Sequence, residues 1–380
     1  MPDKSTLRLH EKLKGKISIA SKVKLTKKNL PLLYTPGVAQ ACLEIAKDPS
    51  LSYKYTNRGN TIAIITDGSR LLGLGNQGPY AALPVMEAKS WILQELADID
   101  AIPLCLETQD QEKIIEIIKN ISPNFAGIHL EDIEAPKCFF IQEELRKQLS
   151  IPVFHDDQDG TAAVILAGLI NALKIVKKEF KETKIVILGA GAAGLALTHL
   201  LIEYGVKKLE VFDSKGNLSI QRNDLNSYKK EISQKLNSKE KSFKEALQNT
   251  DALITLSGKS NSLKKEDLKG MNKDAIIFSL SNPVPEIPWK EAKSIGKILA
   301  SGGSQDYKNQ VNNILSFPGI WEGILDAKTK VVTKKMIIAA AEAIAEFVPK
   351  SKLNKNHILP NVMEKGLTQK VAQRVKEAAS

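Results

Sequence analysis

A glycine-rich turn between a predicted strand and a predicted helix constrains the fold of this chain more than any other feature. The apolar run KIVIL (184–188) leads directly into GAGAAG, which fits the pattern GxGxxG, and an apolar helical stretch follows. The first glycine permits a tight turn, the second lets the backbone approach a pyrophosphate, and the third lets the helix pack on the strand. We therefore predict that the turn binds a dinucleotide through Gly189, Ala190, Gly191, Ala192, Ala193 and Gly194.

An acidic residue at the end of the next predicted strand bears on which dinucleotide binds. Asp213 follows Gly194 by 19 residues. A carboxylate there accepts hydrogen bonds from a ribose hydroxyl and repels a 2′-phosphate. The next two residues, Ser214 and Lys215, offer a hydroxyl and an ammonium that could bind such a phosphate. The residues by themselves leave both NAD and NADP open.

Short β-branched runs alternate with helical patterns on both sides of a long apolar helix, which we predict over 162–177. The expected strands lie at 62–67, 101–107, 125–130, 151–155, 184–188, 209–212, 251–256, 274–280 and 297–301. Such alternation implies βαβ units and mainly parallel sheets, so the fold class is α/β. We expect an N-terminal α/β substrate domain at 1–155 and a Rossmann-type, doubly wound parallel-sheet domain at 156–330. The helical pattern at 331–380 should pack back on the first domain.

The composition indicates a lysine-rich surface rather than a nucleic-acid partner. The formal net charge is +11, yet only six of the 54 cationic residues are Arg. Nucleic-acid readers depend on Arg for bidentate contacts. The three Cys are widely spaced, which fits a reducing compartment. We predict no signal peptide and no membrane span, since the longest apolar stretch (162–176) includes Asn171 and Lys174, and we expect a cytoplasmic protein.

Acidic residues follow two of the predicted strands of the first domain. HLED (129–132) contributes Glu131 and Asp132, and HDDQDG (155–160) contributes Asp156, Asp157 and Asp159. The carboxyl ends of parallel strands are where α/β folds bind ligands, so these acids could converge. Adjacent carboxylates repel one another unless a cation neutralises them, and oxygen ligands favour Mg²⁺ or Mn²⁺. From spacing alone, helix caps and solvated turns explain the acids equally well.

One lysine and several polar loops are further candidates. Lys89 lies on the otherwise apolar helical pattern 84–99, where an isolated lysine usually extends to the surface. The loops have Asn, Gly and Pro in unusual density and could hydrogen-bond a small carboxylate or be plain turns. They are YTPGVA (34–39), DGSRLLGLGNQG (67–78), SNPVPE (281–286) and NQVNNILSFPG (309–319).

Taken together, these segments resemble the malic enzymes of the small prokaryotic type. The segments occur in the family's order and at nearly its spacing from about residue 31 to 330, and more loosely beyond: YTPGVA, DGSRLLGLGNQGP, PVMEAKS, HLEDI, FHDDQDGTA, LGAGAAG, SNPVPEI and QVNNILSFPG. The resemblance implies oxidative decarboxylation of L-malate to pyruvate and CO₂ with reduction of NAD or NADP. It also implies dependence on Mg²⁺ or Mn²⁺, decarboxylation of oxaloacetate, and a homodimer in which Tyr34 could reach the neighbouring subunit's site.

The resemblance further implies roles for the residues that match the family's motifs. Tyr34 would donate a proton to C3 of enolpyruvate, Lys89 would take the proton of the malate hydroxyl, and Asp156 would assist beside the metal. The implied metal ligands are Glu131, Asp132 and Asp157. The implied substrate contacts are Arg70, Lys89, Asn282, Asn312 and Asn313.

The chain departs from the family's pattern at a few positions. Asp159 stands where small members often have His, Ala88 and Ser90 replace Gly and Ala, and the loop 301–310 is one residue longer and lacks its Arg. The stretch DSKG resembles that of NADP-using members, so we expect both cofactors to work with a modest preference for NADP through Lys215. The alternatives are a 2-hydroxyacid dehydrogenase that does not decarboxylate, and a regulatory protein that senses NAD(P)H.

Overall fold

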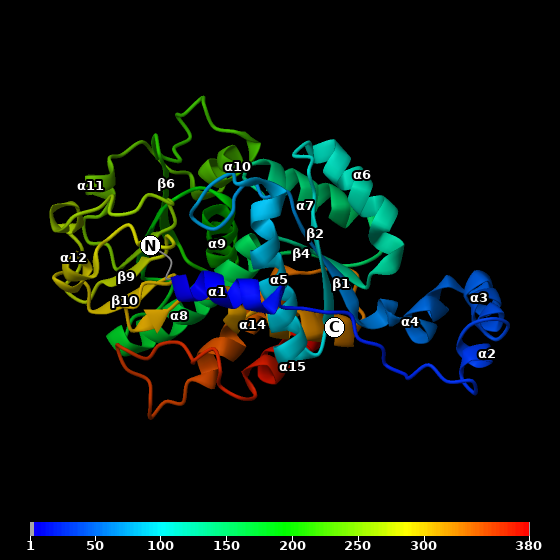
Figure 1. The fold of residues 1–380 in the computed structure, drawn as a ribbon. Helices are drawn as coiled ribbons and strands as arrows, with labels where there is room; N and C mark the ends of the chain where they lie inside the picture. The colour runs from blue at the N-terminus through cyan, green and yellow to red at the C-terminus, as the bar shows by residue number, and fades with distance from the viewer. Residues whose placement is uncertain (1–3, 380) are drawn as a thin grey trace.

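Two parallel sheets lie side by side in the computed structural model, which describes residues 4–379 (Figure 1). The first sheet has the strand order β2-β1-β3-β4, and all its neighbouring strands are parallel. Its strands are β1 (Thr61–Thr66), β2 (Asp100–Cys105), β3 (Gly127–Leu130) and β4 (Val153–His155). The connecting helices are α5 (Gly78–Ala97), α6 (Gln111–Ile121) and α7 (Lys137–Gln148). Helix α5 begins six residues earlier than expected, with Pro79 in its first turn, where a proline fits, and Pro84 inside it.

The second sheet has seven strands in the order β11-β10-β9-β8-β5-β6-β7. All neighbouring pairs are parallel except β6 and the short β7. The strands are β5 (Lys184–Leu188), β6 (Lys208–Asp213), β7 (Gly216–Asn217), β8 (Ala252–Thr255), β9 (Ile276–Ser279), β10 (Ile298–Ser301) and β11 (Asn309–Gln310). Counted outward from β5, this is the doubly wound Rossmann order, and the predicted fold class is confirmed. Helices α9 (Ala192–Glu203), α10 (Ser227–Leu236), α11 (Phe243–Ala246) and α12 (Trp289–Lys293) belong to this half.

Helix α8 (Thr161–Val176) joins the two halves and lies in the core. A single π-helical turn, Asp156–Gly160, precedes it directly. The combined segment 156–176 is long and apolar enough to cross a membrane by length and composition, but 72% of its most apolar window is buried inside the protein. Core helices of globular proteins pass the same test, and the segment carries the apolar side chains that hold both sheets together.

The C-terminal helices pack back on the first domain, as predicted. They are α13 (Phe317–Ala327), α14 (Lys334–Phe347) and α15 (Leu367–Ala378). Helices α13 and α15 contact each other and also contact α5 of the first domain, and α14 packs on α8. Trp321 of α13 is fully buried beneath the first sheet, so this region and the first domain share one hydrophobic core.

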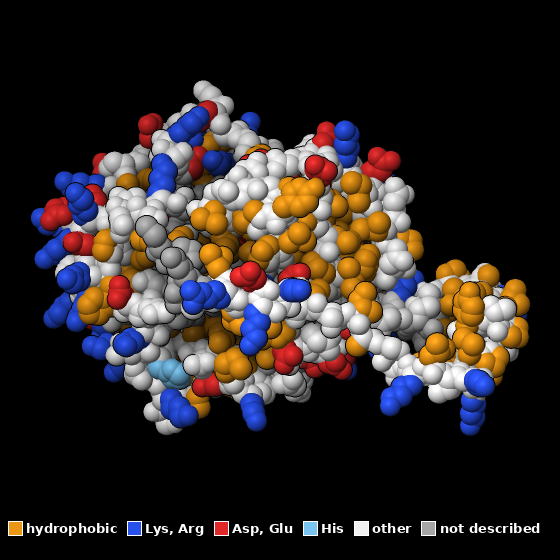
Figure 2. All heavy atoms as spheres, in the orientation of Figure 1, with side chains coloured by type: hydrophobic (Ala, Val, Ile, Leu, Met, Phe, Trp, Pro, Cys, Tyr) orange, Lys and Arg blue, Asp and Glu red, His pale blue; other side chains and the backbone are white. Residues whose placement is uncertain are grey.

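Three of the N-terminal helices stand apart from this core. Helices α2 (Leu30–Leu33), α3 (Val38–Lys47) and α4 (Ser52–Tyr55) form a lobe at the right of Figure 1, whereas α1 (Lys4–Leu13) lies across the main body near α5. None of the residues of α2, α3 and α4 is buried. Apolar side chains gather on this lobe in Figure 2. Leu32, Leu33 and Leu43 of α2 and α3 are all exposed. Exposed apolar patches of this kind mark interaction surfaces.

Candidate active site

A cavity of about 1000 Å³ opens between the carboxyl ends of the two sheets. One end is lined by the acids that follow β3 and β4, and the other by the glycine turn that follows β5. The two blocks of motifs in the sequence therefore meet in one space, although more than 50 residues separate Glu131 from Gly189. Ligands of open α/β sheets bind in such crevices.

The glycine turn has the geometry that its sequence predicts. Gly189 has φ +125°, and a Cβ on it would lie 2.5 Å from the carbonyl of Leu256. A Cβ on Gly194 would lie 1.8 Å from the oxygen of Gly189, so only glycine allows α9 to approach the turn. At Gly191 no atom of the described chain lies within 4 Å of the Cβ position. The N-terminus of α9 thus presents its free N–H groups to the cavity, as anion sites do.

Glu131, Asp132 and Asp157 form a carboxylate cluster at the other end of the cavity. One oxygen of each lies within 4.8 Å of the others. Burial raises the pKa of Asp132, with the carboxylates of Asp157 and Glu131 adding to the effect. Its Oδ2 is buried and has no hydrogen-bond partner in the described part of the chain. Asp132 also has φ +51°, an uncommon conformation that clusters at functional sites.

The donor set of the cluster fits a hard divalent cation. Three carboxylates with an unpartnered buried oxygen are costly to ionise without a positive charge, and oxygen ligands suit Mg²⁺ and Mn²⁺. Of the alternatives left open by the spacing, solvated turns are excluded by burial, because Glu131 and Asp132 are each only 3% exposed.

Lys89 points into the core and not to the surface. It is 8% exposed, forms ion pairs with Asp156 and with Glu131 (3.2 Å), and lies 4.4 Å from the ring centroid of Phe317. Burial alone would lower the pKa of Lys89, but the carboxylates of Asp156 and Glu131 outweigh burial and raise it. The interpretation of Lys89 as an ordinary surface lysine is therefore wrong.

Asp156 connects Lys89 to the second half of the chain. It is fully buried, and Asn313 donates a hydrogen bond of 2.6 Å to the same carboxylate oxygen that contacts Lys89. Burial raises the pKa of Asp156 to about 7, in spite of the nearby ammonium. Asn282, Asn312 and Arg70 line the same cavity, and the Arg70 guanidinium lies beside Gly258. The predicted substrate contacts thus all lie in the lining of the cavity that contains Lys89.

One predicted acid, Asp159, and the predicted proton donor, Tyr34, do not line the cavity. Asp159 does not join Asp157 at the cavity, because residues two apart in a helical turn face different sides. Its carboxylate instead pairs with Arg146 at 3.0 Å, so the expected convergence of Asp159 is wrong. Tyr34 is 66% exposed at the end of α2 and is not among the described residues that line the cavity.

At the adenosine end of the expected dinucleotide site, Asp213 is held by cations that the sequence reading missed. Its two oxygens accept hydrogen bonds from Arg222 (2.8 Å), from Lys229 (2.7 Å) and from the backbone N–H of Lys215. Burial would raise the pKa of Asp213, but the hydrogen bonds from Arg222 and Lys229 outweigh it and lower it. The Lys215 side chain is 68% exposed, and its ammonium pairs with Asp224 at 3.0 Å. Lys215 is not among the described residues that line the cavity, whereas Lys229 is.

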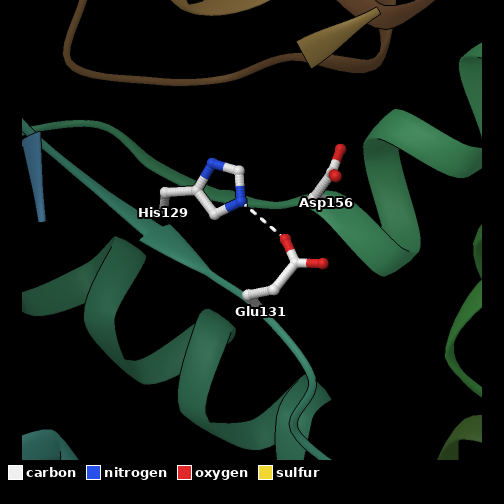
Figure 3. A group of neighbouring side chains, drawn as sticks. All are labelled: His129, Glu131 and Asp156. Carbon is white, nitrogen blue, oxygen red and sulfur yellow. Dashed lines mark hydrogen bonds and ion pairs between the residues drawn. The ribbon is translucent and has the colours of Figure 1, made fainter. Parts of the chain in front are cut away.

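His129 is a further residue that the sequence analysis did not single out. Its Nε2 lies 2.7 Å from Oε2 of Glu131, two residues further along the chain (Figure 3). Burial lowers the pKa of His129 to about 4. The signal in the sequence was the spacing, because residues i and i+2 of a strand lie on the same face. Arg222 also offered a signal, since it is one of only six Arg in the chain.

Two family models match consecutive parts of the chain. The model described as malic enzyme, N-terminal domain, matches residues 14–146, and that described as malic enzyme, NAD binding domain, matches residues 158–380. The chain belongs to the malic enzyme family. The predicted family and the predicted class of NAD- or NADP-dependent oxidoreductase are confirmed.

Malic enzymes of both cofactor types are similar to it. The chain is 45% identical to the NAD-dependent malic enzyme of Geobacillus stearothermophilus over 96% of this chain and 77% of that one. It is 40% identical to the NADP-dependent malic enzyme of Escherichia coli over 90% of this chain and 46% of that one. The crystal structure of the NAD-dependent malic enzyme from Thermotoga maritima superposes with a TM-score of 0.91 at 44% identity, covering 97% of this chain and 98% of that chain.

Proposed function

We propose that this malic enzyme family member oxidises and decarboxylates L-malate to pyruvate and CO₂ in the cavity between its two sheets, with reduction of NAD or NADP. The observation that carries the proposal is the shared cavity, which places Lys89 and the carboxylate cluster in the same space as the glycine turn. The same residues would decarboxylate oxaloacetate, because the second half of the reaction starts from that compound.

The residues of the cavity divide the chemistry among them. Mg²⁺ or Mn²⁺, held by Glu131, Asp132 and Asp157, would supply Lewis acidity at the C2 oxygen and a charge that opposes the carboxylates. Because the neighbouring carboxylates hold Lys89 as an ammonium, Lys89 first gives a proton to Asp156, with which it forms an ion pair, and the neutral amine then takes the proton of the C2 hydroxyl. The donors that could orient the two malate carboxylates are Arg70, Asn282, Asn312 and Asn313.

We further propose a homodimer in which Tyr34 of one subunit completes the cavity of its partner. The enolpyruvate formed by decarboxylation needs a proton at C3, and Tyr34 of the same chain does not line the cavity. The lobe 29–60 that contains Tyr34 has no buried helical residue and exposes Leu32, Leu33 and Leu43. A second copy would cover this apolar surface and bring the phenol to a reacting carbon.

For the cofactor, we propose a modest preference for NADP that depends on Lys229. Because Arg222, Lys229 and a backbone N–H already occupy both oxygens of Asp213, a ribose 2′-hydroxyl finds no free acceptor there. A 2′-phosphate could instead accept from Lys229, which lines the cavity. Lys215, which we expected to carry this preference, is directed to Asp224.

A turnover assay tests the proposed function. Purified protein is given L-malate and NADP or NAD, with Mn²⁺, with Mg²⁺ or with EDTA, and the reduced cofactor, pyruvate and CO₂ are measured. We expect equal amounts of the three products and none in EDTA. Reduced cofactor without CO₂ would identify a 2-hydroxyacid dehydrogenase, and dinucleotide binding without turnover would identify a sensor. The cytoplasmic location stays a prediction.

A further inference from the structure

Two side chains behind the carboxylate cluster form a continuous chain of hydrogen bonds that ends on a proposed metal ligand. Trp321 of α13 lies 2.9 Å from His129 (Nε1 to Nδ1), and His129 lies 2.7 Å from Glu131 (Nε2 to Oε2). Trp321 and His129 are fully buried, and Glu131 is 3% exposed. Figure 3 shows His129 on β3 and Glu131 just past the end of that strand, with Asp156 close by at the start of the π-helical turn that precedes α8.

These contacts fix the proton on the imidazole without any assumption about pH. The indole N–H of Trp321 can only donate, so Nδ1 of His129 must accept and carries no proton. The neutral ring then carries its proton on Nε2 and donates it to the carboxylate of Glu131. Both ring nitrogens are therefore occupied. His129, Glu131 and Asp156 lie close enough to hold a metal ion, but His129 has no lone pair left for one.

The protein makes room for this arrangement on the strand itself. Gly127 lies two residues before His129 on β3, and a Cβ on it would lie 2.4 Å from the indole ring of Trp321. The indole is thus seated against the strand where any other residue would displace it. Phe154 and Phe317 pack edge-on against the imidazole and restrict its orientation in the core.

We propose that Trp321 and His129 are positioning residues for the metal ligand Glu131, an inference that rests on the proposed function. The indole sets the tautomer of His129, and the imidazole N–H holds Oε2 of Glu131. The other oxygen, Oε1, is thereby turned toward Lys89 at 3.2 Å, on the side of the cavity. Hydrogen-bonded partners of this kind orient metal-binding carboxylates and are worth about 10- to 100-fold in metal affinity.

The test is Mn²⁺ binding to the full-length protein without substrate, read from the electron paramagnetic resonance of free Mn²⁺. We expect His129→Leu to weaken Mn²⁺ binding by about 10- to 100-fold and Trp321→Phe by an amount near the lower end of that range. His129→Gln should recover part of the loss, because its amide N–H can reach the position of Nε2. Phe154→Leu is the matched control, since it disturbs the same packing and removes no hydrogen bond.

The outcomes distinguish failure of the proposed metal site from failure of the positioning role of Trp321 and His129. Wild-type protein that binds no Mn²⁺ overturns the metal site and the role together. Mn²⁺ binding that is unchanged in His129→Leu and Trp321→Phe, or equally weakened in Phe154→Leu, overturns only the positioning role. The ¹⁵N spectrum of the unmutated protein provides a readout that does not depend on folding of the variants. We expect an unprotonated Nδ1 on His129, and a proton on that nitrogen would also overturn the proposal.

Discussion

The two ends of the cavity differ in whether their carboxylates have enough cationic partners within the chain. At one end Glu131, Asp132 and Asp157 are clustered, and one buried oxygen of Asp132 has no partner in the described residues. At the other end Asp213 is satisfied by Arg222 and Lys229 within the chain. The first arrangement is incomplete without an added cation, whereas the second already holds its own. The carboxylate end therefore depends on a bound cation for its charge balance. The Asp213 end is already balanced and only discriminates between the two dinucleotides.

The largest expected effect is at the carboxylate cluster. Asp157→Asn removes one of three proposed metal ligands at almost constant shape, so malate oxidation and oxaloacetate decarboxylation should both fall below detection. Dinucleotide binding, followed by quenching of protein fluorescence, should remain because the glycine turn is untouched. Asp159→Asn is the matched control, since its carboxylate pairs with Arg146 on the other side of the same turn. Full activity of the Asp157 variant would show that the carboxylate end of the cavity does not depend on a bound metal ion, and the two ends would then not differ in this respect.

The next effect tests whether the cavity is complete within one subunit. Lys89→Ala should lower malate turnover by about 10²- to 10⁴-fold, the usual cost of losing a general acid or base, and Tyr34→Phe should block the formation of pyruvate. Mixing the two inactive variants under conditions of subunit exchange should restore activity. A mixed dimer with Tyr34 supplied across the interface has one site with both residues intact. If mixing restores nothing while dimers exchange, Tyr34 acts within its own chain or not at all.

A third prediction concerns stability and pH, where the two ends should have opposite signs. Burial raises the pKa of Glu131 from 4.5, and that of Asp156 from 3.8, each to about 7. Between these values Glu131 and Asp156 bind more protons in the folded protein than in the unfolded chain, so without metal their contribution to stability should fall as the pH rises from about 4.5 to 7. The lowered pKa values of His129 and His199 act in the opposite direction over part of this range. The pKa of Asp213 is lowered from 3.8, so its contribution is lost only as the pH falls below that range.

Melting temperatures in EDTA across this pH range would check the sign. Glu131→Gln should flatten the slope near neutral pH, whereas Asp213→Asn should leave it unchanged. Mn²⁺ should raise the melting temperature more at neutral pH than at about pH 5, because the ligands bind metal in their ionised form. A difference in melting temperature between the wild type and Glu131→Gln that stays constant from about pH 4.5 to 7 in EDTA would contradict a raised pKa at Glu131.

The sequence predicts the features that neighbouring residues determine, and it predicts poorly the contacts between residues that are distant in the chain. The strands and the glycine turn follow from the pattern of neighbouring residues, and GxGxxG leaves Gly189 and Gly194 little choice of geometry. The contact between Lys89 and Asp156 joins positions 67 apart in the chain, and no periodicity reveals it. The roles predicted for Lys89 and Asp156 came from the resemblance to the family, and the contact between them was not predicted. Nothing in the sequence distinguishes the acids at 156, 157 and 159 from one another. The helical turn that they form directs the carboxylate of Asp159 to Arg146 and away from the other two.

The ribose end was the least predictable, for a related reason. Which lysine approaches Asp213 depends on the path of the loop after β7, and lysine side chains carry little local signal about direction. Lys215 is adjacent to Ser214 and was the obvious candidate, yet its backbone N–H, and not its ammonium, contacts Asp213. Lys229 reaches Asp213 from α10, 16 residues away.

The smallest expected effect decides between these two lysines. Lys229 is 24% exposed, and an ion pair with solvent access contributes at most about 1 kcal/mol, which corresponds to a change of about 5-fold in affinity. Lys229→Ala should therefore raise KM for NADP about 5-fold. It should leave KM for NAD equal or slightly lower, because it frees an oxygen of Asp213 for the 2′-hydroxyl.

Lys215→Ala is the matched control, since it removes the same charge from the same region but from the far side of Asp224. If the Lys215 variant shows the larger change, the ammonium turns toward the phosphate on binding. The ribose end would then resemble the metal end, in that its charges would be arranged by the ligand and not in advance of it.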